Sequence, residues 1–91
     1  MYNYIRMYEW DDEKRKTNLR KHGVDFAAIE SFIREEAFVQ VDDREDYGET
    51  RYIAFGPIDG RLYCVWFAIR AGNHRIIGLR KANAREVAGY G

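Results

Sequence analysis

Cysteine and histidine are scarce in this sequence of 91 residues, which has one cysteine, Cys64, and two histidines. A lone cysteine cannot form a disulfide within the chain, and with two histidines it does not supply the four clustered ligands of a structural zinc site. No run of about 18 apolar residues could span a membrane, and residues 1–10 lack the pattern of a secretory signal. We therefore expect a cytoplasmic protein without metal, cofactor or membrane contact.

The chain also lacks a net charge, because 15 lysines and arginines balance 15 acidic residues. The charge is nevertheless uneven along the sequence. Residues 42–59 carry two basic and six acidic residues, whereas residues 60–91 carry six basic and one acidic residue. Two interpretations remain open: the basic last third attracts a polyanion, or the acidic middle segment folds against it and neutralises it.

Composition and length predict one folded domain that spans residues 1–91. Hydrophobic residues make up 46% of the chain and aromatic residues 15%, which suits a packed core and argues against disorder. A chain this short must put nearly all of its apolar surface into one core.

Two helices are predicted near the N-terminus. Asp11 and Asp12 can cap a surface helix over roughly 12–22, whose last turn is basic and which Gly23 ends in a left-handed conformation. Asp25 can cap a second helix. Its apolar residues recur at the spacing of one buried stripe, namely Phe26, Ile29, Phe32 and Ile33.

Strands are predicted over 2–10, from alternating aromatic residues, and over 37–42, 51–56, 61–70 and 74–81. In segment 61–70 the odd-numbered and the even-numbered residues are both largely apolar, as in a central strand that is covered on both faces. Asp59-Gly60 and Gly72-Asn73 mark hairpin turns. If the numbers of each pair of opposed residues in the second hairpin add up to 144, Gly78 lies opposite Trp66 and leaves room for the indole.

The last part of the chain predicts a short helix, because Asn83 and Glu86 have the spacing of a capping box and Gly89 can end the helix. The whole order gives the fold class α+β. We expect the two N-terminal helices to pack on one face of a mostly antiparallel, meander-type sheet.

His22 and Lys21 are the first candidates for chemistry. The unperturbed pKa of a histidine lies near neutral pH, so His22 can exchange a proton. The alternative is that both residues only favour the negative end of the helix dipole. Neighbouring residues on a helix also point about 100° apart, so the two need not reach one ligand.

Cationic residues at the ends of two adjacent predicted strands are the second candidates, namely Arg70, Arg75, Arg80 and Lys81. Guanidinium groups match phosphate oxygens and stay charged. The alternative is salt bridging to the acidic segment 42–49. Within 46–51, Glu49 and Arg51 form either an acid and cation pair at the mouth of the sheet or part of an ordinary loop.

Together these residues resemble the BrnT toxins of type II toxin–antitoxin modules, over roughly Tyr8 to Lys81. The matching pieces are Tyr-Glu-Trp-Asp at 8–11, Asn18, Lys-His-Gly-Val at 21–24 with Phe26, Asp-Tyr-Gly-Glu at 46–49 with Arg51, and Arg-Ile-Ile at 75–77 with Arg80. The resemblance implies a RelE-like fold, RNA as substrate, inhibition of translation, and a BrnA-like antitoxin through which any contact with DNA is made. It points to Lys21, His22, Glu49, Arg51, Arg70 and Arg80 as site residues.

The chain departs from the pattern of that family at two strands. Ala68 and Ile69 precede Arg70, and Gly78 and Leu79 precede Arg80, where the family commonly has polar residues. Both arginines are kept and their polar companions are not, so loss of activity is one outcome that the sequence allows. The family's usual C-terminal pattern is also altered here, which puts a role of the tail in activity in doubt.

Our first hypothesis is a metal-independent endoribonuclease, because RNA supplies its own nucleophile: the 2′-hydroxyl attacks the phosphate and leaves a 2′,3′-cyclic phosphate. His22 as acid with Glu49 as base is one assignment, and His74 is another candidate. A catalytically degenerate module that only binds an antitoxin is the alternative. A sequence-specific DNA binder is disfavoured, because no helix has clustered basic and amide side chains.

Overall fold

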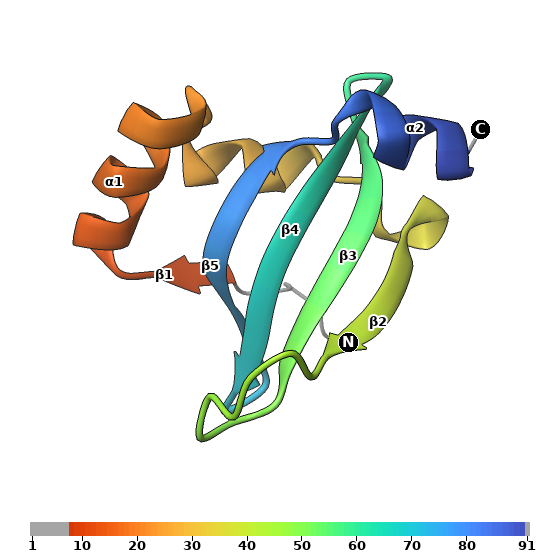
Figure 1. Cartoon of the computed structure of the whole chain (residues 1–91). Coiled ribbons are helices and arrows are strands. Elements are labelled where there is room, and N and C mark those ends of the chain that lie inside the picture. The colour runs from red at the N-terminus through yellow and green to blue at the C-terminus, as the bar shows by residue number, and fades with distance from the viewer. Residues whose placement is uncertain (1–7, 91) are drawn as a thin grey trace, which may run out of the picture.

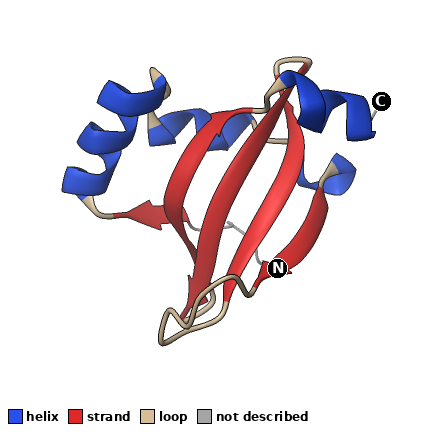
Figure 2. Cartoon of the chain, viewed as in Figure 1, coloured by secondary structure: helices blue, strands red, loops and turns tan. Residues whose placement is uncertain are grey.

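The structure is a computed structural model, and it describes residues 8–90. One strand, three helical segments, four consecutive strands and a final helix follow one another, as Figures 1 and 2 show. In chain order they are β1 (Tyr8–Trp10), α1 (Asp12–His22), the 3₁₀ helices η1 (Phe26–Ser31) and η2 (Arg34–Glu36), β2 (Phe38–Asp42), β3 (Arg51–Ile58), β4 (Arg61–Arg70), β5 (Asn73–Lys81) and α2 (Ala84–Tyr90).

One five-stranded sheet forms the centre, with the strand order β1-β5-β4-β3-β2. β2 to β5 are antiparallel neighbours, which confirms the predicted meander, and β1 joins β5 in parallel. The sheet is therefore mixed. Of the strand predicted over 2–10, the structure places Tyr8–Trp10 in β1, while residues 2–7 lie outside the described part of the chain.

α1 has the predicted ends. The carboxylate of Asp11 accepts a hydrogen bond from the backbone N–H of Lys14, and Gly23 adopts φ 71° while its N–H donates to the carbonyl of Leu19. The placement of α1 differs from the prediction. It lies beside β5 at the margin of the sheet, so the two N-terminal helices do not form a pair on one face (Figure 1).

The second predicted helix is the 3₁₀ helix η1, which Asp25 caps by accepting from the N–H of Ala27. Phe26 and Ile29 are buried as expected, but Ile33 is 40% exposed, so its place in the buried stripe was wrong. A 3₁₀ helix has three residues per turn, which disrupts the four-residue step of an α-helix. The chain then extends after Ser31, and Phe32 forms a β-bridge with Ile58.

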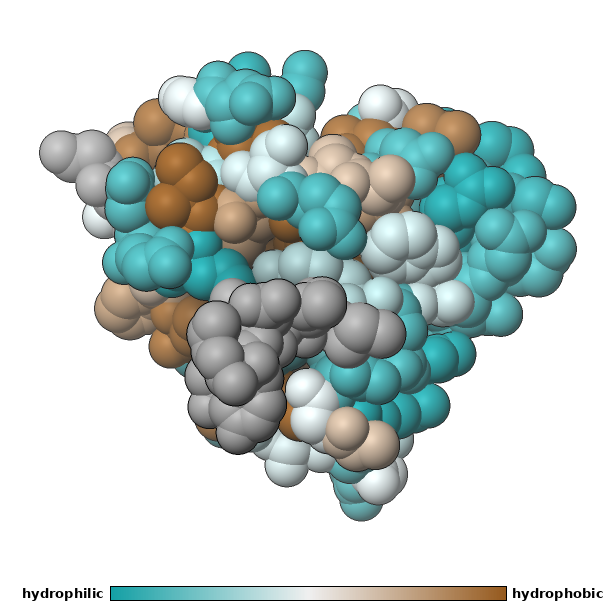
Figure 3. Space-filling view, turned by 180° about the vertical axis from the view of Figure 1, so that it is seen from behind, coloured by the Kyte–Doolittle hydropathy of each residue, from teal (hydrophilic) through white to brown (hydrophobic). Residues whose placement is uncertain are grey.

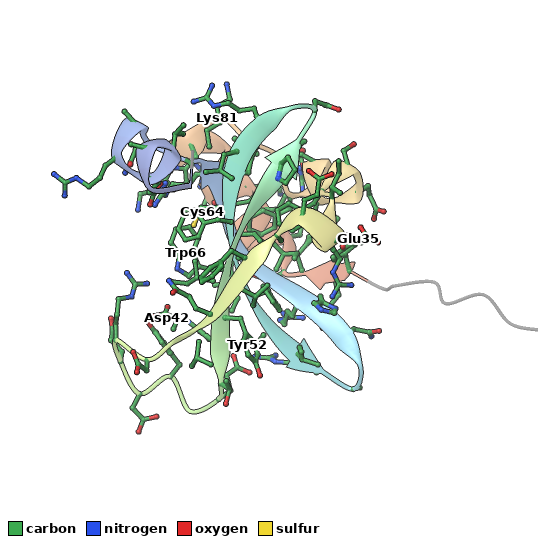
Figure 4. The ribbon with its side chains drawn as sticks, turned by 90° about the vertical axis from the view of Figure 1, so that its right-hand side faces the viewer. Glu35, Asp42, Tyr52, Cys64, Trp66 and Lys81 are labelled. Atoms are coloured by element: carbon green, nitrogen blue, oxygen red, sulfur yellow. The ribbon has the colours of Figure 1, made fainter. Side chains whose placement is uncertain are left out.

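Helical segments cover parts of both faces of the sheet. η1 packs on the face that holds the main core, and α2 lies across the other face (Figures 1 and 4). The core consists of Val24, Phe26, Ile29, Ala54, Ile58, Val65, Phe67, Ile76 and Leu79. β4 is buried on both faces as predicted, since the adjacent residues Cys64 and Val65, which point to opposite faces, are both nearly inaccessible to solvent. Ile69 near the end of the strand is 51% exposed.

Two-residue turns connect the last three strands. The predicted turn at Asp59-Gly60 is confirmed, and both of its residues have positive φ. The second turn consists of Ala71 and Gly72, one residue earlier than expected, because Arg70 pairs with Asn73. Gly78 still lies opposite Trp66 as predicted, because Ile77 forms a β-bulge that shifts the register by one residue.

α2 begins with the predicted capping box. The side chain of Asn83 accepts from the N–H of Glu86 at 2.8 Å, and the carboxylate of Glu86 accepts from the N–H of Asn83 at 2.8 Å. Gly89 does not end the helix, which continues to Tyr90. No helix in residues 8–90 is long and apolar enough to cross a membrane.

Candidate active site

Four arginines project from one face of the sheet, which we call the arginine face: Arg51, Arg70, Arg75 and Arg80. Residues paired across antiparallel strands share a face, as do alternate residues of one strand. Arg80 pairs with Cys64 and Arg75 with Ala68, so both share the face of Trp66 and Arg70. This is the face on which α2 lies, and Figure 4 shows Cys64 and Trp66 on it.

The bulge at Ile77 is the reason that Arg75 and Arg80 share a face. Five positions separate them, and in a regular strand an odd separation puts two side chains on opposite faces. The bulge at Ile77 adds one residue to the strand, so Arg75 and Arg80 point to the same face. This effect cannot be read from the alternation of residue types in β5.

Glu49 joins two of the predicted arginines at one end of this face. Its carboxylate accepts two hydrogen bonds from Arg70, at 3.0 Å each, and Nε of Arg51 lies 3.8 Å from Oε2. The hydrogen bond from Arg70 is the main cause that lowers the pKa of Glu49, and the nearby charges of Arg70, Arg51 and Arg75 lower it further. Glu49 is therefore ionised at neutral pH and holds the guanidinium groups in place.

The loop before Glu49 is braced by a separate buried carboxylate. Asp42 accepts hydrogen bonds from Arg44 at 2.7 and 2.9 Å and from the hydroxyl of Tyr47 at 3.1 Å. These bonds, chiefly those from Arg44, hold the pKa of Asp42 at about 2. The ring of Tyr47 in turn lies under Arg51, 4.2 Å from its Cζ, so this loop supports the position of Arg51.

The remaining arginines have carboxylate partners of their own. Arg75 donates to Glu9 at 2.9 Å, and Arg80 donates two hydrogen bonds to Glu86, at 2.8 and 2.9 Å. Of the four cations for which a salt bridge to segment 42–49 was the alternative, Arg70 contacts the segment, through Glu49. The salt-bridge interpretation is thus correct for Arg70, while Arg75 and Arg80 pair with acids outside the segment.

Lys21 and His22 line one cavity of about 280 Å³ between α1 and the sheet. Trp66 and Gly78 form part of its wall, so the last turn of α1 faces the arginine face. Although adjacent helix residues diverge, both side chains reach this space. Arg80 lies over the Trp66 ring, with its Cζ 5.1 Å from the ring centroid.

The surroundings of His22 lower its pKa although the residue is exposed. Partial desolvation is the main cause that lowers the pKa of His22 below its ordinary value, and the positive charges of Lys21 and Arg80 lower it further. Each of these factors disfavours the imidazolium ion. The neutral form of His22, which can accept a proton, is therefore favoured at neutral pH.

Asn18 is a residue to which the sequence pattern gave no structural role. It is 8% exposed, and its side chain forms three hydrogen bonds: it donates to the carbonyls of Val24 and Leu79 and accepts from the N–H of Leu79. The side chain of Asn18 thus binds both backbone groups of Leu79 at the edge of β5, as the backbone of a neighbouring strand would do. A lone asparagine on a polar helix gives no local signal of this contact.

The six predicted residues form two groups on the same side of the sheet. Lys21, His22 and Arg80 surround Trp66, whereas Glu49, Arg51 and Arg70 gather at the end of β4. Trp66 and Arg70 are four residues apart along one strand, roughly 13 Å at strand rise. A short stretch of nucleic acid could contact both groups.

His74, the other candidate for proton transfer, lies outside this site, and Cys64 is not reactive. His74 pairs with Ile69 on the opposite face of the sheet, so it does not approach the four arginines. Burial raises the pKa of the Cys64 thiol to about 12, which leaves it protonated and unreactive. Within residues 8–90, no three His, Cys, Asp or Glu side chains are grouped as a metal site requires.

Comparison with known proteins identifies the class to which this fold and site belong. A family model described as the ribonuclease toxin BrnT of type II toxin–antitoxin systems matches residues 10–86. The class is therefore that of type II toxins. The chain belongs to the BrnT family of ribonuclease toxins.

A solved structure supports the same assignment. The 1.1 Å crystal structure of the Brucella abortus ribonuclease toxin BrnT matches with a TM-score of 0.63 and 30% sequence identity, over 85% of this chain and 97% of that chain. No curated protein matches the sequence. The fold is thus BrnT-like, while the wider likeness to RelE stays a prediction.

Proposed function

We propose that this chain is an endoribonuclease toxin that cleaves RNA without a metal ion and so inhibits translation. The observation that supports this best is the cavity where Lys21 and His22 of α1 meet Trp66, with Arg80 on its ring. A neutral base and two cations around one cavity are the groups that cleavage by the 2′-hydroxyl requires.

In this mechanism His22 takes the proton from the 2′-hydroxyl of the bound nucleotide. The 2′-oxygen then forms a bond to phosphorus, the bond from phosphorus to the 5′-oxygen breaks, and the 5′-oxygen takes a proton from solvent. The products are a 2′,3′-cyclic phosphate and a 5′-hydroxyl. Lys21 and Arg80 stabilise the negative charge that develops on the phosphate oxygens. No metal is needed, because RNA supplies the nucleophile and the protein supplies the base and the cations.

Glu49, Arg51 and Arg70 act on the next part of the RNA. Both carboxylate oxygens of Glu49 accept hydrogen bonds from Arg70 and its pKa is lowered, so in this proposal Glu49 holds guanidinium groups and is not the general base. A flanking phosphate would bind Arg70 and Arg51 from the open side of this group. Asn18 keeps α1 against β5 and so acts as a positioning residue for Lys21 and His22.

The antitoxin belongs to the same proposal. A BrnA-like protein would neutralise the toxin and supply the ribbon-helix-helix part that contacts DNA, so this chain would meet DNA only indirectly. We also expect the chain to act in the cytoplasm, where its RNA substrate is found.

RNA cleavage by the wild type and by His22→Ala tests the mechanism. General-base catalysis typically contributes 10²- to 10⁴-fold, so we expect cleavage to fall by about 100-fold or more. Because the pKa of His22 is lowered, the acid limb of the wild-type pH profile should lie below pH 6.5 and should vanish in the variant. Equal rates would remove His22 from catalysis.

The product ends and a chelator test the remaining steps. Cleavage should persist in EDTA, and the new 3′ ends should resist poly(A) polymerase until a phosphatase that opens cyclic phosphates has treated them. Loss of activity in EDTA that Mg²⁺ restores would contradict the metal-free mechanism.

A second candidate function has one specific observation in its favour. Arg70, Arg75 and Arg80 each already pair with a glutamate, as expected of a degenerate toxin that binds an antitoxin but cuts no RNA. Expression without antitoxin separates the two candidates, because a nuclease arrests growth and cleaves transcripts, whereas a binding module does neither.

A further inference from the structure

A second cavity, of about 220 Å³, lies on the face of the sheet opposite to the arginine face. Its floor is apolar and comes from the core side of the sheet, with Ala54, Phe67 and Ile76. Phe32 and η2 form one side, and Val39 of β2 forms another. Figure 4 shows Glu35, which lines this cavity, and Trp66 on opposite sides of the sheet.

Arg34 gives this apolar cavity a specific polar group. Its Nη2 lies 3.2 Å from Nε2 of His74, while its Nη1 is buried and has no hydrogen-bond partner among residues 8–90. A buried donor without a partner is rare in folded proteins, because it has lost its water and gained nothing in return. A carboxylate that entered the cavity would accept from this nitrogen.

The surface next to the cavity is suited to a protein and not to RNA. Val39 and Val41 lie on the cavity's side of β2, and they are 51% and 56% exposed. Seen from behind, apolar residues gather toward the side of the molecule where β2 runs (Figure 3). Together the two half-exposed valines extend the apolar surface beyond the hollow, and a continuous exposed apolar surface is suited to contact with another protein.

We propose that this cavity is the docking site for the antitoxin. The antitoxin would insert a large apolar side chain into the cavity, bind Arg34 with a neighbouring Asp or Glu carboxylate, and cover Val39 and Val41 with further apolar residues. The volume suffices, since a cavity of about 150 Å³ can hold a benzene ring. The inference rests on the proposed function for the identity of the partner, and it separates the antitoxin surface from the RNA surface.

The test compares two variants of this surface with matched controls. Arg34→Met removes the guanidinium group and keeps an apolar stem, and Arg61→Met makes the same change at an exposed arginine that lines neither cavity. Val39→Lys adds a charge beside the cavity, while Gln40→Lys adds it at the next residue, on the opposite face. All four positions are at least partly exposed, so the variants should fold.

Affinity for the antitoxin of the same module, measured by calorimetry, should fall at least tenfold for Arg34→Met and Val39→Lys. The two controls should bind as the wild type does. All four variants should cleave RNA at the wild-type rate if the chain is a nuclease. If none cleaves RNA while Arg34→Met still loses the antitoxin, the nuclease proposal fails and the docking site stands.

Two outcomes would overturn the docking site. One is unchanged antitoxin affinity in both Arg34→Met and Val39→Lys. The other is a dimer of this chain, seen by analytical ultracentrifugation, that Val39→Lys dissociates while antitoxin affinity is unchanged, since the surface would then belong to a second copy.

Discussion

Asn18 is the residue that connects helix, sheet and site. Its amide satisfies both backbone groups of Leu79, beyond the point where β1 has ended, and also binds the carbonyl of Val24. The loop after α1 and the edge of β5 therefore share one buried side chain. Lys21 and His22 follow within the next turn of the same helix, so their positions depend on this contact.

Removal of the Asn18 amide should both destabilise the protein and reduce activity. Asn18→Ala leaves buried groups of Leu79 and Val24 without partners, and we expect a loss of roughly 3 kcal/mol in the free energy of unfolding. Asn83→Ala is the matched control, because it removes an exposed helix cap and should lose only about 1 kcal/mol. Urea unfolding measures both, and equal losses would show that Asn18 is no special anchor.

The start and the end of α1 are determined by its capping residues and not by an apolar face. α1 has one buried residue, Asn18, so it has no apolar stripe to hold it against the core. Its cap at Asp11 and its left-handed end at Gly23 define it instead. η1 shows the opposite case, because Phe26 and Ile29 are deeply buried and packing favours a tighter 3₁₀ turn.

A pair of glycine substitutions tests the role of the helix ends. Gly23 has φ 71°, where a Cβ costs about 1 kcal/mol, so Gly23→Ala should destabilise the protein by that amount. Gly89 lies in α2, and apart from its chain neighbours and the helix backbone no atom of the described residues lies within 4 Å of the position that an added methyl group would take. Gly89→Ala should therefore stabilise by roughly 0.5 to 1 kcal/mol. The midpoint temperature of thermal unfolding should fall for Gly23→Ala and rise for Gly89→Ala. A shift in the same direction for both variants would contradict this account.

At the scale of the whole molecule, the sheet separates two kinds of surface. The arginine face carries alternating cations and carboxylates, and the cavity beside α1 opens on it. The other face carries the core, the cavity at Arg34 and the exposed valines of β2. RNA and antitoxin would thus meet different sides of one thin sheet.

The carboxylates of the arginine face predict how stability depends on pH. The pKa values of Glu9, Glu49 and Glu86 are lowered from the ordinary 4.5, each mainly by hydrogen bonds from an arginine, and that of Asp42 is lowered from 3.8 to about 2. A depressed pKa in the folded state stabilises the protein above the ordinary value. That contribution is lost as pH falls through the folded value.

We therefore expect the free energy of unfolding to be level above about pH 6.5, to fall slightly below that value because the pKa of His22 is lowered, and to decline further from about pH 4.5 toward pH 2. Asp42→Asn should flatten the lower part of this decline, because it removes the group with a pKa of about 2. Urea unfolding at several pH values measures the slope. A decline that is identical in the variant would show that Asp42 does not contribute to it.

Residues close together in the sequence were enough to predict the ends of α1, the turn at Asp59-Gly60, the capping box of α2 and the double-sided burial of β4. These features depend on backbone conformation and alternation within a few residues. The same local patterns failed for Ile33 and for the position of the second turn, where packing decided.

Contacts between segments that are far apart in the sequence decided which residues lie together in the candidate site. Asn18 and Leu79 are 61 residues apart, and the bulge at Ile77 decides that Arg75 and Arg80 share a face. No pattern in one segment contains such contacts, because they arise only when strands pair and a helix packs beside them. The sequence thus pointed to the family and to a set of candidate site residues, and the pairing of the sheet decided which of these residues meet.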